Sequence, residues 1–173
     1  MATRFPPAMI AVLLALGAGV NFAQEPKTPA ANPGAPVVLF VCEHGSAKSV
    51  VAASYFNLLA QERGLPHRAV ARGTQPDDAV APSAARGLLA DGLDVRDFKP
   101  QRVSAADVEK ATRVVSLGCD LSSVARGAEG EKGKLQRWDD IPSVGKDYRT
   151  SRDAMVDHIK RLMDELAEKG SHH

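Results

Sequence analysis

The sequence is poor in aromatic side chains and in net charge. Of its 173 residues only 5% are Phe, Trp or Tyr, and 22 Lys and Arg are balanced by 21 Asp and Glu. A nucleic-acid-binding surface usually needs a basic excess and stacking aromatic rings, and a solvating tail needs a block of one charge. We therefore expect no nucleic-acid partner and no charged tail.

A hydrophobic run long enough to cross a bilayer is also lacking at the N-terminus. The apolar stretch from Ala8 to Val20 has about 13 residues, whereas a membrane-spanning helix needs about 20. Arg4 precedes this stretch and small residues up to Ala23 follow it, which is the pattern of a secretory signal. An uncleaved N-terminal anchor is the alternative.

The domain organisation follows from this pattern. We expect residues 1–23 to be a signal peptide and residues 24–36, rich in Pro and Ala, to be a linker. Residues 37–169 would then form one folded domain, exported to the periplasm or secreted, with no membrane contact once the signal is removed. No metal-ligand, nucleotide or flavin motif is present, so we expect no cofactor and no metal.

Cysteine is scarce, with only Cys42 and Cys119. In an oxidising compartment such a pair could form a structural disulfide. A free cysteine there would have to be shielded or kept reduced by a partner.

Apolar runs alternate with helical patterns along the domain. The segment VVLFVC at 37–42 is a continuous β-branched run, typical of a strand buried on both faces of a parallel sheet. We expect Ser104 to be the N-cap of a short helix that follows it. The pattern predicts a three-layer α/β fold with a four-stranded parallel sheet flanked by helices. We expect strands near 37–42, 67–74, 112–119 and 135–142, and further helices near 49–63, 83–91 and 150–169.

Three chemically notable segments fall at the carboxyl ends of these expected strands. Cys42 ends the first strand, Cys119 ends the third, and the segment DDIP follows the fourth. Ligands of parallel sheets bind at this edge. The sequence therefore predicts one site there.

The loop after Cys42 has the composition of an anion-binding loop. Small residues let a backbone curl until its N–H groups face an oxyanion, and the following helix adds its positive end. The same field makes a cysteine nucleophilic. A buried cysteine in an ordinary strand–turn–helix is the alternative. The expected oxyanion-binding loop is Glu43, His44, Gly45, Ser46, Ala47 and Lys48, and Ser49 would donate a hydrogen bond to the sulfur.

These segments resemble the low-molecular-weight protein tyrosine phosphatase superfamily, which includes thioredoxin-linked arsenate reductases. The family motif is a strand, then C-x5-R-S, then a helix, and CEHGSAKS matches it except at Lys48. The segments ARGT, ADGLDV, TRVVSLGCD and WDDIP follow in the family's order. The resemblance implies that Cys42 attacks phosphorus or arsenic, that the loop and Lys48 hold the oxygens, and that an aspartate protonates the leaving oxygen.

Two departures from the family motif bear on activity. Lys48 is a point charge, whereas arginine clamps two oxygens in a planar fork. Arg72 is a candidate for an auxiliary cation that would supplement Lys48 at the loop. The family has Asp directly before Pro, but here Ile141 intervenes, so either Asp139 or Asp140 could be the acid. Asp140 is preferred because it is nearer the proline.

Three functions remain open on the sequence. A phosphatase acting on a phosphate monoester, phosphotyrosine among the candidates, would need only Cys42, the loop and an acid. An arsenate reductase would use Cys42 with Cys119 as a second redox cysteine, or with an external thiol reductant. An inactive oxyanion-binding relative is the third. The expected ligand is a small oxyanion or a phosphorylated substrate.

Overall fold

A computed structural model of the chain describes residues 34–126 and 133–170. The predicted signal peptide and most of the predicted linker lie outside these residues and stay predictions. Within the described ranges, no helix is long and apolar enough to pass through a membrane.

Four parallel strands form one sheet in the order β2-β1-β3-β4. Their bounds are β1 Val37–Cys42, β2 Arg68–Gly73, β3 Ala111–Ser116 and β4 Leu135–Arg137. The predicted parallel sheet is confirmed. β3 is shorter than expected because the chain turns at Gly118, whose φ of 77° is not an extended conformation. Cys119 therefore lies in the turn after β3 and does not end the strand.

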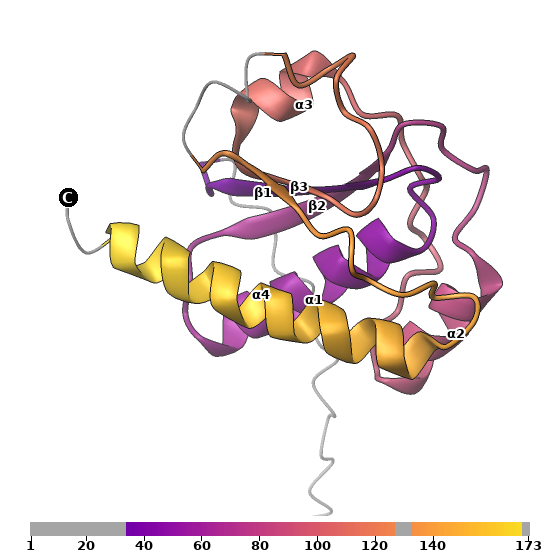
Figure 1. Cartoon of the computed structure of the whole chain (residues 1–173). Coiled ribbons are helices and arrows are strands. Elements are labelled where there is room, and N and C mark those ends of the chain that lie inside the picture. Colours follow the sequence, from indigo (N-terminus) through magenta and orange to yellow (C-terminus); the bar gives the residue numbers. More distant parts are fainter. Residues whose placement is uncertain (1–33, 127–132, 171–173) are drawn as a thin grey trace, which may run out of the picture. The chain divides into compact units, whose positions relative to one another are not determined.

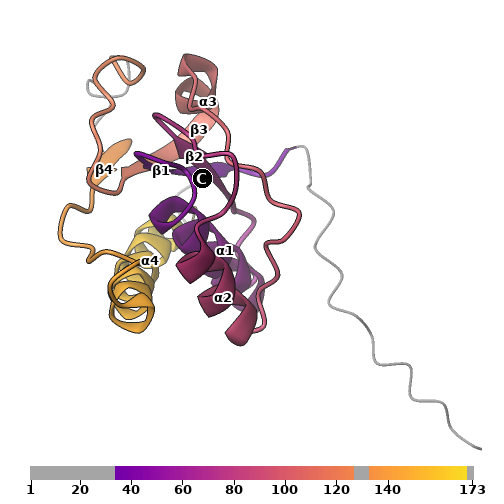
Figure 2. The ribbon, with the colours of Figure 1, turned by 90° about the vertical axis from the view of Figure 1, so that its right-hand side faces the viewer.

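Helices cover both faces of the sheet, which confirms the three-layer α/β fold. The first two are α1 Lys48–Glu62 and α2 Pro82–Ala90, followed by α3 Ala105–Lys110 and α4 Tyr148–Gly170. In Figure 1 the strands lie between α3 above and α1 and α4 below. Figure 2 shows α1, α2 and α4 on one face and α3 on the other. Ser104 caps α3 as predicted, because its hydroxyl accepts from the Asp107 N–H in a capping box.

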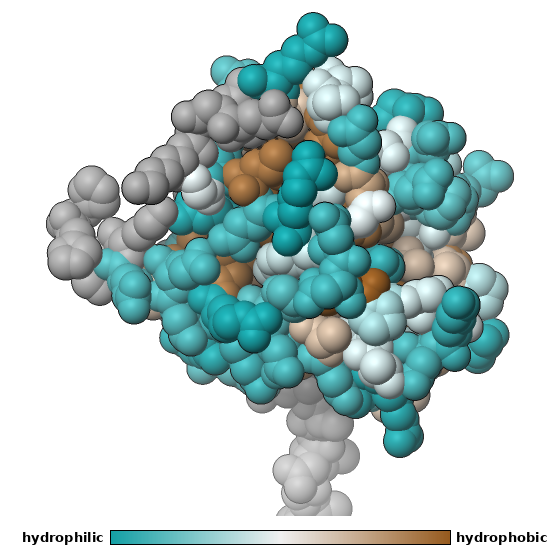
Figure 3. Space-filling model, in the orientation of Figure 1, coloured by the Kyte–Doolittle hydropathy of each residue, from teal (hydrophilic) through white to brown (hydrophobic). Residues whose placement is uncertain are grey.

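The larger core lies between the sheet and α1 and α4. The ring of Phe40 on β1 packs between those of Phe56 and Trp138, with centroids 5.9 and 5.6 Å apart. Trp138 is thus a core residue. The apolar stripe of α4 is buried here, and its outer side is covered largely by hydrophilic side chains (Figure 3).

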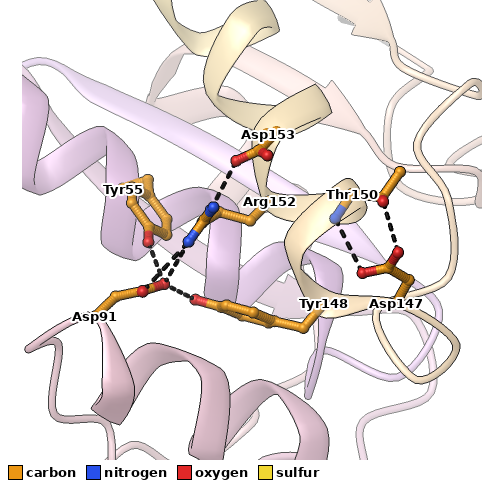
Figure 4. A network of polar contacts seen from close by, with 7 residues as sticks. All are labelled: Tyr55, Asp91, Asp147, Tyr148, Thr150, Arg152 and Asp153. Carbon is orange, nitrogen blue, oxygen red and sulfur yellow. Dashed lines mark hydrogen bonds and ion pairs between the residues drawn. The ribbon is translucent and has the colours of Figure 1, made fainter.

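A polar network ties three helices together (Figure 4). Asp91, just after α2, accepts hydrogen bonds from the hydroxyls of Tyr55 at 2.6 Å and Tyr148 at 2.7 Å. Arg152 of α4 lies 3.3 Å from the same carboxylate. Because Tyr148 begins α4, this network sets where the preceding loop, residues 138–147, enters the helix.

Candidate active site

The loop between β1 and α1 curls at Gly45, which has a φ of 61°. A Cβ atom on Gly45 would lie 2.8 Å from the backbone nitrogen of Gly73 at the end of β2. Only glycine permits both the left-handed backbone and this close approach. The geometry of the loop therefore requires glycine at position 45 of the segment CEHGSAKS.

The carbonyl groups of this loop are held by the next loop, residues 74–81. Four N–H groups of that loop donate to four carbonyls of the first, at 2.8–3.1 Å: Thr74 to Cys42, Gln75 to Glu43, Asp77 to His44 and Ala81 to Ser46. In the described part of the chain, the N–H groups of residues 43–47 have no acceptor. The loop thus keeps unpaired backbone donors, as an oxyanion nest requires.

Cys42 lies at the base of the loop. It is buried, and its Sγ is 3.2 Å from the Oγ of Ser49 in the first turn of α1. Ser49 is fully buried and has no other side-chain partner among the described residues. A hydroxyl in this position stabilises a thiolate, both as a nucleophile and as a leaving group.

Lys48 turns inward, toward the loop that follows β4. Its Nζ donates to the carbonyl of Ile141 at 2.7 Å. Ile141 is buried, and the next carbonyl, of Pro142, accepts from the hydroxyl of Ser151 at 2.6 Å. The lysine therefore joins the anion-binding loop to the 138–147 loop, and it keeps two ammonium hydrogens for an anion.

A cavity of about 220 Å³ opens over the cysteine. The anion-binding loop forms one side, and Leu117 and Gly118 after β3 form another. The third side comes from Ser143, Val144 and Gly145. Such a cavity is large enough for a phosphate or arsenate group above the sulfur.

Neither candidate aspartate lines this cavity, contrary to the expectation for Asp140. Its Oδ2 lies 2.9 Å from Nε2 of His158 on α4, and this hydrogen bond holds the pKa of Asp140 below its ordinary value. The position directly before Pro142 is filled by Ile141, whose side chain enters the core. Asp139 is exposed and also lies outside the cavity lining.

Arg72 does not supply a second cation to the loop. Its guanidinium lies 3.4 Å from Asp107 and donates to its neighbouring carbonyl at Ala71. Arg72 pairs in register with Val41, so its side chain leaves the sheet on the α3 face. The auxiliary role is therefore not supported.

The two cysteines are free thiols. The Cys119 thiol donates to the carbonyl of Val41 at 3.4 Å, which places it beside the end of β1. Burial raises the pKa of the Cys119 thiol, and the nearby Cys42 sulfur acts in the same direction. Cys119 is therefore close to Cys42, and its burial favours the protonated thiol.

Some partners of the site were not predicted from the sequence. Asp77 accepts from Ser46 at 2.6 Å and lies 3.4 Å from Nδ1 of His44, so it braces the rim of the loop. The Ile141 carbonyl was missed as well, since a backbone acceptor carries no sequence signal. Among residues 34–126 and 133–170, no group of three His, Cys, Asp or Glu side chains could hold a metal ion.

The fold and this loop define a class of protein: a small α/β domain with a buried cysteine at the base of a loop whose backbone N–H groups are unpaired. The sequence model of the low molecular weight phosphotyrosine protein phosphatase family matches residues 37–171. The chain belongs to this family, which confirms the resemblance. No curated protein matches the chain.

Solved structures of phosphatases and arsenate reductases share the fold. YfkJ from Bacillus subtilis is 16% identical with a TM-score of 0.67, covering 80% of this chain and 98% of its own. The YwlE arginine phosphatase from Geobacillus stearothermophilus is 19% identical with a TM-score of 0.63, covering 80% and 97%. An arsenate reductase from Archaeoglobus fulgidus is 29% identical with a TM-score of 0.56, covering 72% and 97%. The family is thus one of enzymes.

Proposed function

We propose that the protein hydrolyses phosphate monoesters through a covalent cysteinyl phosphate on Cys42. The observation that carries this proposal is the buried Cys42 sulfur, 3.2 Å from the Ser49 hydroxyl, at the base of a loop whose N–H groups are unpaired. A phosphatase needs this nucleophile and this oxyanion site, and no second cysteine.

In the first step the Cys42 thiolate attacks phosphorus and the bond to the leaving oxygen breaks. The loop N–H groups and Lys48 would hold the three equatorial oxygens, where negative charge is greatest in the transition state. Water then attacks the cysteinyl phosphate, and Ser49 stabilises the departing sulfur. The contact of Lys48 with the Ile141 carbonyl supports this role, because it keeps the ammonium at the cavity and out of solvent.

Turnover of p-nitrophenyl phosphate by the reduced full chain tests the proposal. We expect release of inorganic phosphate that Cys42→Ser abolishes, while Cys119→Ser keeps it. Phosphate release that persists in Cys42→Ser, or no release by the unaltered chain, would refute the proposal.

Arsenate reduction is a second candidate, favoured by the placement of Cys119 beside the end of β1. Cys42 would bind arsenic, and a thiol would displace it as a disulfide forms. The raised pKa of Cys119 argues for an external thiol as the reductant. Arsenate-dependent consumption of such a thiol, lost in Cys42→Ser, would distinguish this activity.

We also propose that the protein is exported and that residues 1–23 are removed. The apolar stretch after Arg4 and the Pro- and Ala-rich segment after it support this proposal. The mass of the protein recovered from cells tests it: a chain that retains its first 23 residues would contradict cleavage.

A further inference from the structure

Alcohol leaving groups need a proton, and neither of the two candidate aspartates lines the cavity described above. Asp140 is bound to His158, Asp139 lies outside the cavity, and the position before Pro142 is a buried isoleucine. If the protein hydrolyses esters of ordinary alcohols, the proton must come from another residue at the cavity.

Four titratable side chains line the 220 Å³ cavity, and three of them have other tasks: Cys42, Glu43, His44 and Lys48. Cys42 is the nucleophile of the proposed function. Lys48 is bound to the Ile141 carbonyl and serves as the cation for the anion. His44 is drawn toward Asp77, at 3.4 Å. The remaining group is the carboxyl of Glu43.

Glu43 is held by its backbone but free at its carboxyl. Its carbonyl accepts from the N–H of Gln75 at 2.8 Å and from the hydroxyl of Thr74 at 3.3 Å. Among the described residues its carboxyl lies 3.8 Å from Nε2 of His44, and 60% of its side chain is exposed. The residue is thus anchored next to the nucleophile while its acid group can reach a substrate.

A second cavity, of about 530 Å³, adjoins the first and shares Glu43 and Gly118 as walls. As far as the described residues line it, this cavity is hydrophilic and contains no aromatic ring: the polar side chains are Glu43, Thr74, Gln75, Arg102, Asp120 and Ser123, beside Cys119. Arg102 is oriented by a hydrogen bond to the carbonyl of Thr74 and has no carboxylate partner among the described residues. This cavity suits a hydroxylated group better than an aryl ring.

We propose that Glu43 is the general acid of the reaction and that the second cavity holds the leaving group, a hydrophilic alcohol. This inference rests on the proposed function. Among the described residues Glu43 is the one acidic residue that lines both cavities, so it stands where the bond between phosphorus and the leaving oxygen would break.

The proton and electron movements balance. As the Cys42 sulfur bonds to phosphorus, the P–O electron pair goes to the leaving oxygen, which takes the proton of the Glu43 carboxyl. The resulting carboxylate then takes a proton from water as that water attacks phosphorus, and the S–P electron pair returns to sulfur. The products are the alcohol, inorganic phosphate and the starting thiolate. The titratable and charged groups near Glu43 are His44 and Lys48 in the loop, and Arg102 and Asp120 across the second cavity.

The test compares two substrates of the reduced full chain. The leaving group of p-nitrophenyl phosphate departs as the phenolate without taking up a proton, whereas the alcohol of glycerol 2-phosphate must be protonated as it leaves. Because a general acid contributes about 100-fold or more, we expect Glu43→Gln to lower kcat/KM for glycerol 2-phosphate by about that factor. The loss for p-nitrophenyl phosphate should be about tenfold or less. Glu43→Asp should restore part of the lost activity on glycerol 2-phosphate.

Asp139→Asn, Asp140→Asn and His44→Gln are the matched variants. The assignment is overturned if Glu43→Gln affects both substrates equally, or if one of these three carries the selective loss instead. It is overturned too if the unaltered chain cleaves p-nitrophenyl phosphate but not glycerol 2-phosphate. If neither substrate shows turnover that depends on Cys42, the proposed function itself fails. A melting curve of Glu43→Gln shows whether that variant is folded, so a loss of activity caused by misfolding is recognised.

Discussion

Lys48 combines two roles that the structure lets us separate. Its Nζ donates to the Ile141 carbonyl at 2.7 Å, and it lines the cavity in which the anion would sit. A lysine offers one point charge, whereas an arginine offers a planar pair of donors. Gly118 leaves room for a larger side chain at position 48, because even a Cβ atom added to Gly118 would be 3.8 Å from the Nζ of Lys48.

Lys48→Arg should therefore increase the rate. One more charge-assisted hydrogen bond is worth about 1.5–3 kcal/mol, so kcat/KM for p-nitrophenyl phosphate should rise roughly tenfold or more. Lys48→Met should lower it by a similar factor. Equal losses in both variants would mean that the contact with Ile141, and not the charge at the anion, is what the lysine provides.

Ser49 should matter most after the cysteinyl phosphate has formed. Its hydroxyl is the buried neighbour of the Cys42 sulfur, so without it the sulfur is a poorer leaving group. We expect Ser49→Ala to show a burst of p-nitrophenolate followed by a steady rate about tenfold lower. Ser122→Ala removes an exposed hydroxyl that donates to Asp120 and is the control. A Ser49→Ala variant without a burst and with an unaltered rate would contradict this role.

At the scale of the elements, the Asp91 network joins α1, α2 and α4. Burial by itself would raise the pKa of Asp91, but hydrogen bonds from Tyr55, Tyr148 and Arg152 outweigh it and hold that pKa below its ordinary value. The carboxylate therefore stabilises the fold above the pKa of the unfolded chain, near 4, and this contribution is lost as the pH falls through the lower folded value.

Asp91→Asn should reduce the free energy of unfolding at neutral pH by about 1–3 kcal/mol, because two tyrosine hydroxyls and a guanidinium lose their charged acceptor. The difference from the unaltered chain should shrink in acid below about pH 4. Urea titrations at both pH values measure it. Asp164→Asn breaks an exposed pair with Arg63 and should change stability by at most about 0.5 kcal/mol. An Asp91→Asn chain as stable as this control would contradict the account.

The main elements could be predicted because their signals are local. The β-branched run before Cys42, the cap at Ser104 and the stripe on α4 each lie within a few residues of the element they define. The four strands and the anion-binding loop followed from such signals. The end of β3 did not, because Gly118 turns the chain before Cys119.

The pairing of side chains across the sequence could not be predicted in the same way. The sequence favours Asp140 as the acid but carries no signal for its hydrogen bond with His158, 18 residues away. Arg72 is a candidate cation on the sequence, but in the structure its guanidinium lies 3.4 Å from Asp107 on the α3 face. The hydrogen bond from Tyr148 to Asp91 joins residues 57 apart. These contacts depend on how helices pack, and a helical or strand pattern contains no such information.

At the scale of the whole molecule, the account depends on one edge of the sheet. The loops after β1, β2 and β3 and the loop before α4 meet there, and they supply the carbonyl anchors and the walls of the cavity above Cys42, the proposed nucleophile. Because phosphatases and arsenate reductases share this fold, the fold does not determine which reaction is catalysed, and the residues of these loops do. The covalent step at Cys42 is therefore the central claim.

Trapping the intermediate tests that claim most directly. The reduced full chain would be mixed with p-nitrophenyl phosphate, quenched within the first turnover and digested. The mass of the peptide that contains Cys42 would then be measured by mass spectrometry. The account predicts one added phosphoryl group on Cys42, accumulating further in Ser49→Ala and absent in Cys42→Ser. Turnover with no phosphoryl group on Cys42 in any of these samples would contradict it.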